Sequence, residues 1–211
     1  MTITRANEAP TGIEFVRQGL DRFSVPTDAR LNESSASTAR SAAEAADGPR
    51  IDHFHPVYDL GAEIALNGRG LDAAELVGFR YIVHAADGEL SAAEVRTDAT
   101  PGAPPMTMTK RIYGSYAEAV VGRLEQVEKL PEVAARTYEL RVLECPGISL
   151  ALWLKGDQGA PDILWPLSPA AGEFHPDRPY SADEFLNIVR RMIQARIADQ
   201  AALLEREKTT R

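Results

Sequence analysis

The chain has 211 residues, a formal net charge of −8 and an apolar content of 44%, values typical of a soluble globular protein. The acidic balance and the lack of a basic stripe argue against nucleic-acid and anionic-membrane binding, and no apolar run approaches the roughly 20 residues that span a bilayer. The single cysteine, Cys145, and the absence of an apolar leader before residue 12 favour a cytoplasmic location.

Residues 1–50 are expected to form an N-terminal arm and linker, separate from an α+β domain over residues 51–211. The arm contains one apolar stripe at helical spacing, formed by Ile13, Val16, Leu20 and Phe23. Because so short a helix is marginal in water, the stripe is expected to dock on the chain's own sheet or on another protein. Residues 27–50 are rich in Ala and Ser and indicate a linker.

Alternating apolar residues and turn signals predict strands after residue 51. The clearest segments are 79–84, 89–97, 106–113, 137–145, 148–155 and 162–167. Asp87-Gly88 is typical of a hairpin turn, and a second turn is expected over residues 156–159. These short connections favour antiparallel pairing.

Two long helices are predicted, one from Ser115 to the residues before Pro131 and one that begins at Ser181. The second carries a capping box and an apolar stripe, formed by Leu186, Val189, Ile193 and Ile197 and continuing toward Leu204. This helix is expected to be integral to the core. The predicted fold is therefore α+β, an antiparallel-type sheet with two long helices packed on one face, plus the N-terminal helical or extended arm.

The segment IDHFHP, residues 51–56, raises the question of a metal site. On a strand, His53 and His55 share one side about 6.5 Å apart, which suits two metal ligands. The segment resembles the first-strand His-x-His of the amidohydrolase metal enzymes, but the predicted hairpins are incompatible with their parallel barrel. The loose similarity to the cupin motifs is interrupted by a long helix. We therefore expect hydrogen-bonded or solvated histidines on a strand edge, with no metal and no cofactor. The alternative is a site built from His53, His55, His84 and His175.

Other residues carry weaker signals. Cys145 closes an apolar strand and is expected in the core, and no phosphate-binding loop, nucleophile elbow or helical metal motif occurs in the sequence. Trp153 and Trp165 lie on strands either side of the second turn. Together they would line a ligand pocket or an exposed contact patch, or they cap the sheet core.

The sequence favours a protein that acts by binding, as a partner-docking or assembly component, with a protein partner or self-association. The alternative is a small metal-dependent or small-molecule-binding enzyme that uses His53 and His55. A third hypothesis is a ligand pocket between the sheet and the helices.

Overall fold

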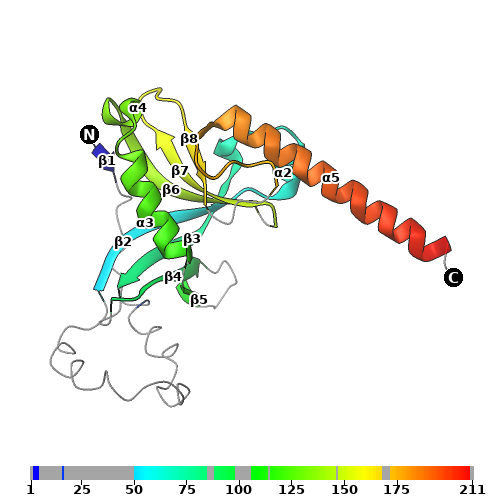
Figure 1. Cartoon of the computed structure of the whole chain (residues 1–211), viewed down its shortest axis with the longest axis horizontal. Coiled ribbons are helices and arrows are strands. Elements are labelled where there is room, and N and C mark those ends of the chain that lie inside the picture. Colours follow the sequence, from blue (N-terminus) through cyan, green and yellow to red (C-terminus); the bar gives the residue numbers. More distant parts are fainter. Residues whose placement is uncertain are drawn as a thin grey trace, which may run out of the picture. The chain divides into compact units, whose positions relative to one another are not determined.

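A computed structural model gives the arrangement of the chain (Figure 1). It describes residues 2–4, 16, 50–84, 88–97, 106–113, 115–145, 147–167 and 172–209, some of them by their backbone alone. The fold is α+β, with mostly antiparallel strands and a long C-terminal helix, as the sequence predicts. The chain divides into two compact units. Unit 1 comprises residues 1–5, 57–76 and 122–211, and unit 2 comprises residues 6–56 and 77–121.

The division into units does not follow the predicted boundary at residue 50. Strand β2 (Arg50–Asp59), strand β3 (Glu75–His84) and helix α3 (Ser115–Val127) each pass from one unit to the other. Each unit is therefore built from segments far apart in the sequence, which composition along the chain does not reveal.

Unit 1 contains a strand order of β2-β6-β7-β8-β9. Strand β6 (Thr137–Cys145) pairs in parallel with the end of β2 and with β1 (Thr2–Thr4). The remaining pairs are antiparallel and join β6 to β7 (Ser149–Gly156), β8 (Ile163–Pro166) and β9 (Tyr180–Ser181). The predicted turn at residues 156–159 is confirmed. Gln158 and Gly159 both have positive φ, and Ala160 N donates to Asp157 O at 2.9 Å, as in a type I′ turn.

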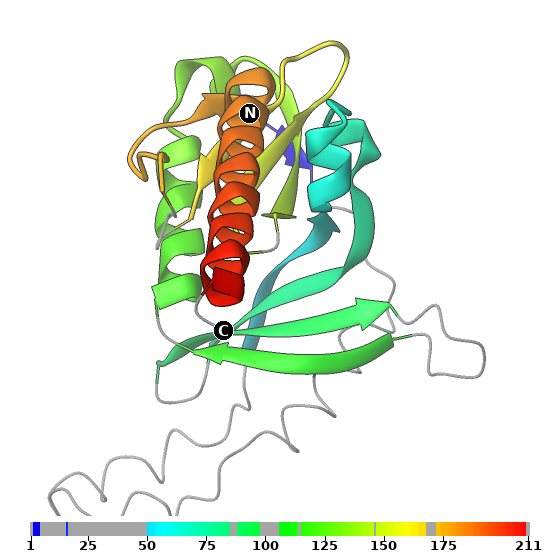
Figure 2. The ribbon, with the colours of Figure 1, turned by 90° about the vertical axis from the view of Figure 1, so that its right-hand side faces the viewer.

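Helix α5 (Ala182–Thr209) covers one face of these strands, with α2 (Ala62–Leu66) beside it (Figure 2). Its start is the predicted one, because Ser181 Oγ accepts a hydrogen bond from Glu184 N at 3.3 Å. The first half of α5 packs into a core with Leu143, Trp153 and Leu164 of the strands. No described helix combines the length and apolar character needed to cross a membrane.

The two long helices do not share one face of the unit 1 strands, in contrast to the prediction. Trp165 pairs with Leu152 in the register of β7 and β8, whereas Trp153 pairs with Leu164. Because side chains alternate along a strand, Trp165 points away from the face that α5 covers. The Arg123 guanidinium of α3 lies 5.2 Å from the centre of the Trp165 ring, so α3 contacts the opposite face. Two short elements complete unit 1. Helix α4 (Pro131–Ala134) follows α3. A 3-10 turn, η2 (Leu71–Ala73), follows α2.

Unit 2 is built on β3, β4 (Leu90–Thr97) and β5 (Met106–Tyr113), paired antiparallel as predicted. One face of β3 and β4 is apolar and packs against Val16, which is fully buried. The residues of β3 and β4 in that cluster are Tyr81, Val83, Ala93 and Val95. The other members of the predicted docking helix, Ile13, Leu20 and Phe23, lie outside the described residues. Val16 therefore packs on the chain's own sheet.

Candidate functional site

The second half of α5 lies at the surface of unit 1. We call residues Gln194–Lys208 the α5 arm. Every residue of the arm is exposed, and Figure 1 shows this part of α5 running beyond the strands that its first half covers. The prediction that the C-terminal helix is integral to the core therefore holds as far as Ile193 and fails for the residues beyond it. Ile193 is 5% exposed, whereas Ile197 and Leu204 are each 53% exposed.

The arm exposes large apolar side chains on a single side of the helix. Ile197, Leu203 and Leu204 follow Ile193 at intervals of four, ten and eleven residues, which places them on one face at 100° per residue. That face continues the side by which Val189 and Ile193 pack into the core. The arm is thus the continuation of a core-forming helix face past the end of its own core.

Local interactions hold the arm in helical form. Arg196 Nη1 donates to the Gly147 carbonyl at 2.7 Å, and Lys208 Nζ donates to Glu205 Oε1 at 2.7 Å one turn earlier. Gly147 has φ of +70° and lies against Arg196, so a side chain at residue 147 would collide with the guanidinium. The basic residues Arg206 and Lys208 in the last turn are favourable beside the carbonyl end of the helix dipole.

His55 belongs to a buried polar network in unit 2. Its side chain is fully buried, and its Nε2 lies 3.4 Å from the Tyr116 hydroxyl. The Arg80 guanidinium lies 4.7 Å from the centre of the Tyr116 ring and forms an ion pair with Glu94. Arg96 Nε donates to the other carboxylate oxygen of Glu94 at 2.7 Å. The sequence did not reveal this network, because charged residues on a strand such as Arg80 and Glu94 are usually exposed to solvent.

The charges of the network stabilise each other. Burial alone would raise the pKa of Glu94, but the charge and hydrogen bonds of Arg80 and Arg96 outweigh it and lower that pKa. Burial likewise opposes the charge of Arg80, yet Tyr116 and Glu94 raise its pKa overall. Since Arg80, Glu94 and His55 are at most 2% exposed, the network holds β3 and β4 together rather than receiving a solute.

The histidines considered as metal ligands are not brought together in the described part of the chain. There, no cluster of three or more His, Cys, Asp or Glu side chains suits a metal ion. The His53 side chain lies outside the described residues. His84 ends β3 in unit 2, and His175 lies exposed in a loop of unit 1. Cys145 is buried, and burial, with Asp59 and Glu144 nearby, raises the pKa of its thiol to about 12.

Trp153 and Trp165 do not form a common patch. They point to opposite faces of the strands and are 1% and 5% exposed. Trp153 instead joins a cluster in which the Arg141 guanidinium lies 4.6 Å from the centre of the Tyr58 ring and 4.8 Å from that of Trp153. The Trp153 indole N–H donates to Asp162 at 3.0 Å. The indole N–H and the ring face of Trp153 are therefore engaged by residues of the chain itself.

Lys155 links this cluster to the η2 turn. Its Nζ donates to Asp72 at 2.8 Å and lies 3.5 Å from Asp162. The hydrogen bond that Lys155 donates to Asp72, together with the charge of Asp162, raises the pKa of Lys155. The ammonium is therefore engaged by two carboxylates and is a poor candidate for a nucleophile.

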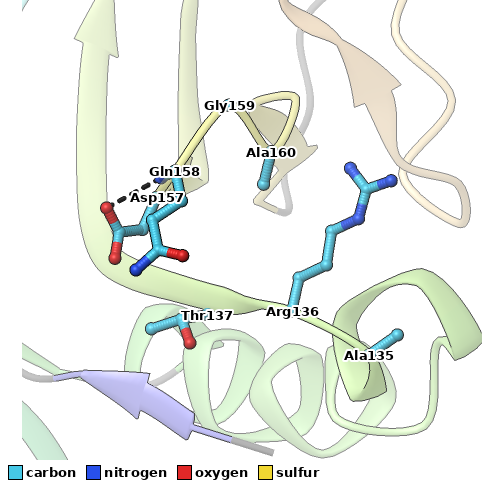
Figure 3. A pocket seen from close by; sticks show the side chains of 7 residues that line it. All are labelled: Ala135, Arg136, Thr137, Asp157, Gln158, Gly159 and Ala160. Atoms are coloured by element: carbon cyan, nitrogen blue, oxygen red, sulfur yellow. Dashed lines mark hydrogen bonds between the residues drawn. The ribbon is translucent and has the colours of Figure 1, made fainter.

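A polar pocket of about 370 Å³ lies beside the type I′ turn of unit 1 (Figure 3). Its lining residues are Ala135, Arg136, Thr137, Asp157, Gln158, Gly159 and Ala160. The Asp157 carboxylate is engaged by the Gln158 backbone N–H at 2.8 Å. The lining contains no aromatic or large apolar side chain, whereas small-molecule sites are mostly apolar with a few placed polar groups. The pocket therefore supports ligand binding less well than the α5 arm supports protein binding.

No family model, no curated protein and no solved structure matches the chain.

Proposed function

We propose that the protein acts by binding another protein chain, as a partner-docking or assembly component, through the α5 arm. The observation that carries this proposal is the exposure of Ile197, Leu203 and Leu204 on the continuation of the helix face that packs into the core as far as Ile193. An amphipathic helix face of this kind binds a groove or a second helix through residues spaced by three and four.

Energetics support a partner for the arm. Most helix stability in proteins comes from packing of an apolar face, and the apolar face of the arm is exposed. Complete burial of an Ile or Leu side chain contributes roughly 1.5–3 kcal/mol. The three apolar side chains of the arm are each more than half exposed, so a partner could recover a large part of that energy.

The charge of the arm favours a protein over a nucleic acid or a membrane. Its basic residues are Arg196, Arg206 and Lys208, and its acidic residues are Asp199, Glu205 and Glu207, so the formal charges cancel. Membrane-surface helices and phosphate-binding helices instead carry an excess of Lys and Arg. We also propose the cytoplasm as the compartment, which the single buried cysteine supports.

A pair of matched variants of the full chain tests the proposal. Ile197→Glu with Leu204→Glu places two charges on the apolar face, and Ala198→Glu with Ala202→Glu adds the same charge on the other side of the helix. In extract of the producing cells, wild type and the control should elute as a species larger than the monomer. The first variant should elute as a monomer. Identical elution of all three chains would refute docking through the arm.

A further inference from the structure

The polar pocket beside the turn between β7 and β8 contains an unpaired cation. Among the described residues, the Arg136 guanidinium has no ion-pair or hydrogen-bond partner. Elsewhere in unit 1, Arg123, Arg178 and Arg191 each pair with a carboxylate. A guanidinium offers five N–H donors in a planar fork. Arg136 therefore has its donors available to a solute in the pocket.

The turn on the other side of the pocket has a backbone that its residue type does not favour. In the described part of the chain, Gln158 is the one residue other than glycine with positive φ, at +51°. Asn or Gly is the usual choice at this position of a type I′ turn. Backbone conformations of this kind cluster at functional sites, where the side chain has a use that offsets the strain. The choice of Gln158 therefore indicates a use for its longer amide side chain.

Gly159 keeps the space beside the turn open. Apart from its chain neighbours, no atom lies within 4 Å of the position that a Cβ of Gly159 would occupy. Gln158 and Gly159 are both exposed, so a solute can reach the pocket without any movement of the chain.

We propose that this pocket binds a linear polyhydroxylated monocarboxylate, the chemical class of the open-chain sugar acids. Arg136 binds the carboxylate through charge-assisted hydrogen bonds, in the two-pronged geometry that suits a guanidinium. The Gln158 amide and the Thr137 hydroxyl bind hydroxyl groups, because each can both donate and accept. The α5 arm contributes no residue to this lining, so the site is a second one, beyond the proposed function.

The lining selects this class over others. It has no aromatic or large apolar side chain on which a nucleobase, a lipid or a sugar ring could pack. The Arg136 guanidinium and the Gln158 amide lie apart in Figure 3, so an elongated ligand is needed to contact both. The Asp157 carboxylate, which accepts a hydrogen bond from Gln158 N at 2.8 Å, opposes a second negative charge. The volume of about 370 Å³ is within the range of small-molecule sites.

Heteronuclear NMR titration of the purified full chain with D-gluconate tests the class of ligand. Gluconate should shift the backbone amide signals of Gln158, Gly159 and Ala160 in a saturable manner. Sorbitol lacks the carboxylate and hexanoate lacks the hydroxyls, so each should bind at least about tenfold more weakly. Glucarate, with a second carboxylate, should also bind more weakly than gluconate. Absence of saturable shifts with gluconate, or equal binding of sorbitol or hexanoate, would refute the proposal.

Three variants test the residues. Arg136→Gln should weaken gluconate binding at least about tenfold, whereas Lys129→Gln, which removes an exposed positive charge outside the lining, should leave it unchanged. Equal affinities of these two variants would show adventitious attraction of an anion only and refute the site. Gln158→Asn should weaken binding even where it stabilises the chain, because a residue kept for a ligand is often not the most stable choice. Unchanged gluconate affinity in Gln158→Asn would refute the role of Gln158.

Discussion

The buried ion pair of unit 2 gives a sharp stability prediction. Glu94→Gln keeps the shape of the side chain but leaves the Arg80 guanidinium, whose side chain is 1% exposed, without its carboxylate. Removing one member of a buried ion pair costs about 3–5 kcal/mol. For a chain of this size each kcal/mol corresponds to roughly 2–4 °C, so the melting temperature should fall by about 6–20 °C. Thermal unfolding followed by circular dichroism at pH 7 measures the shift.

Two companion variants make the test specific. Glu139→Gln removes one member of a partly exposed pair with Arg141, in which the side chains are 31% and 17% exposed, and should cost no more than about 1 kcal/mol. Replacing both buried partners, as Arg80→Met with Glu94→Leu, should recover most of the loss, because no charge is then left buried. The reasoning is refuted if Glu94→Gln costs no more than Glu139→Gln.

The pH dependence of the same pair has a defined sign. Pairing lowers the pKa of Glu94 in the folded state below its ordinary value of 4.5. Its contribution to the free energy of unfolding is therefore complete above pH 4.5 and is lost as pH falls through the lowered pKa. The difference in stability between wild type and Glu94→Gln should narrow below pH 4.5 and stay constant between pH 6 and 8. A difference that widens toward acid would contradict the assignment of the charge to Glu94.

Three further predictions concern the helix, the turn and the histidines. Ile193→Asp should unfold unit 1, because it buries an unpaired charge. Ile197→Asp, one turn later at an exposed position, should change the free energy of unfolding by less than about 0.5 kcal/mol. Equal effects of the two variants in chemical denaturation would show that the core does not end at Ile193. Gln158→Asn should stabilise the chain by up to about 1 kcal/mol, because Asn tolerates the φ of +51° at this position better than Gln does. An unchanged or lowered melting temperature would contradict this expected stabilisation. Metal analysis should find no bound Zn, Fe, Mn or Ni; about one equivalent that disappears in His53→Ala with His55→Ala would overturn the expectation.

Local patterns predicted the elements of unit 1 well. The capping box at Ser181, the turn at Gln158-Gly159 and the alternation along β6 and β7 depend on neighbours in sequence, so residue spacing reveals them. The face that each helix covers depends on which residues of distant strands lie opposite each other. That register, set by pairs such as Leu152 with Trp165, is not encoded in local spacing.

The candidate sites were harder to predict for the same reason. The stripe that ends at Leu204 has one periodicity throughout, but only its first half meets the strands, and sequence pattern cannot indicate where a partner surface ends. Arg80 and Glu94 come from adjacent strands and satisfy each other, so polar residues typical of a solvated face are buried instead. Helical spacing marked Val16 as part of a docking stripe, but it could not show that Val16 would meet β3 and β4 of unit 2.

The central claim is that the apolar face of the α5 arm contacts another protein chain. A photoreactive amino acid at position 204 of the full chain, irradiated in the producing cells, tests it most directly. The prediction is a covalent adduct heavier than the chain from position 204 and none from position 202, which lies on the opposite side of the same helix. Equal adducts from both positions, or none from position 204, would contradict the claim.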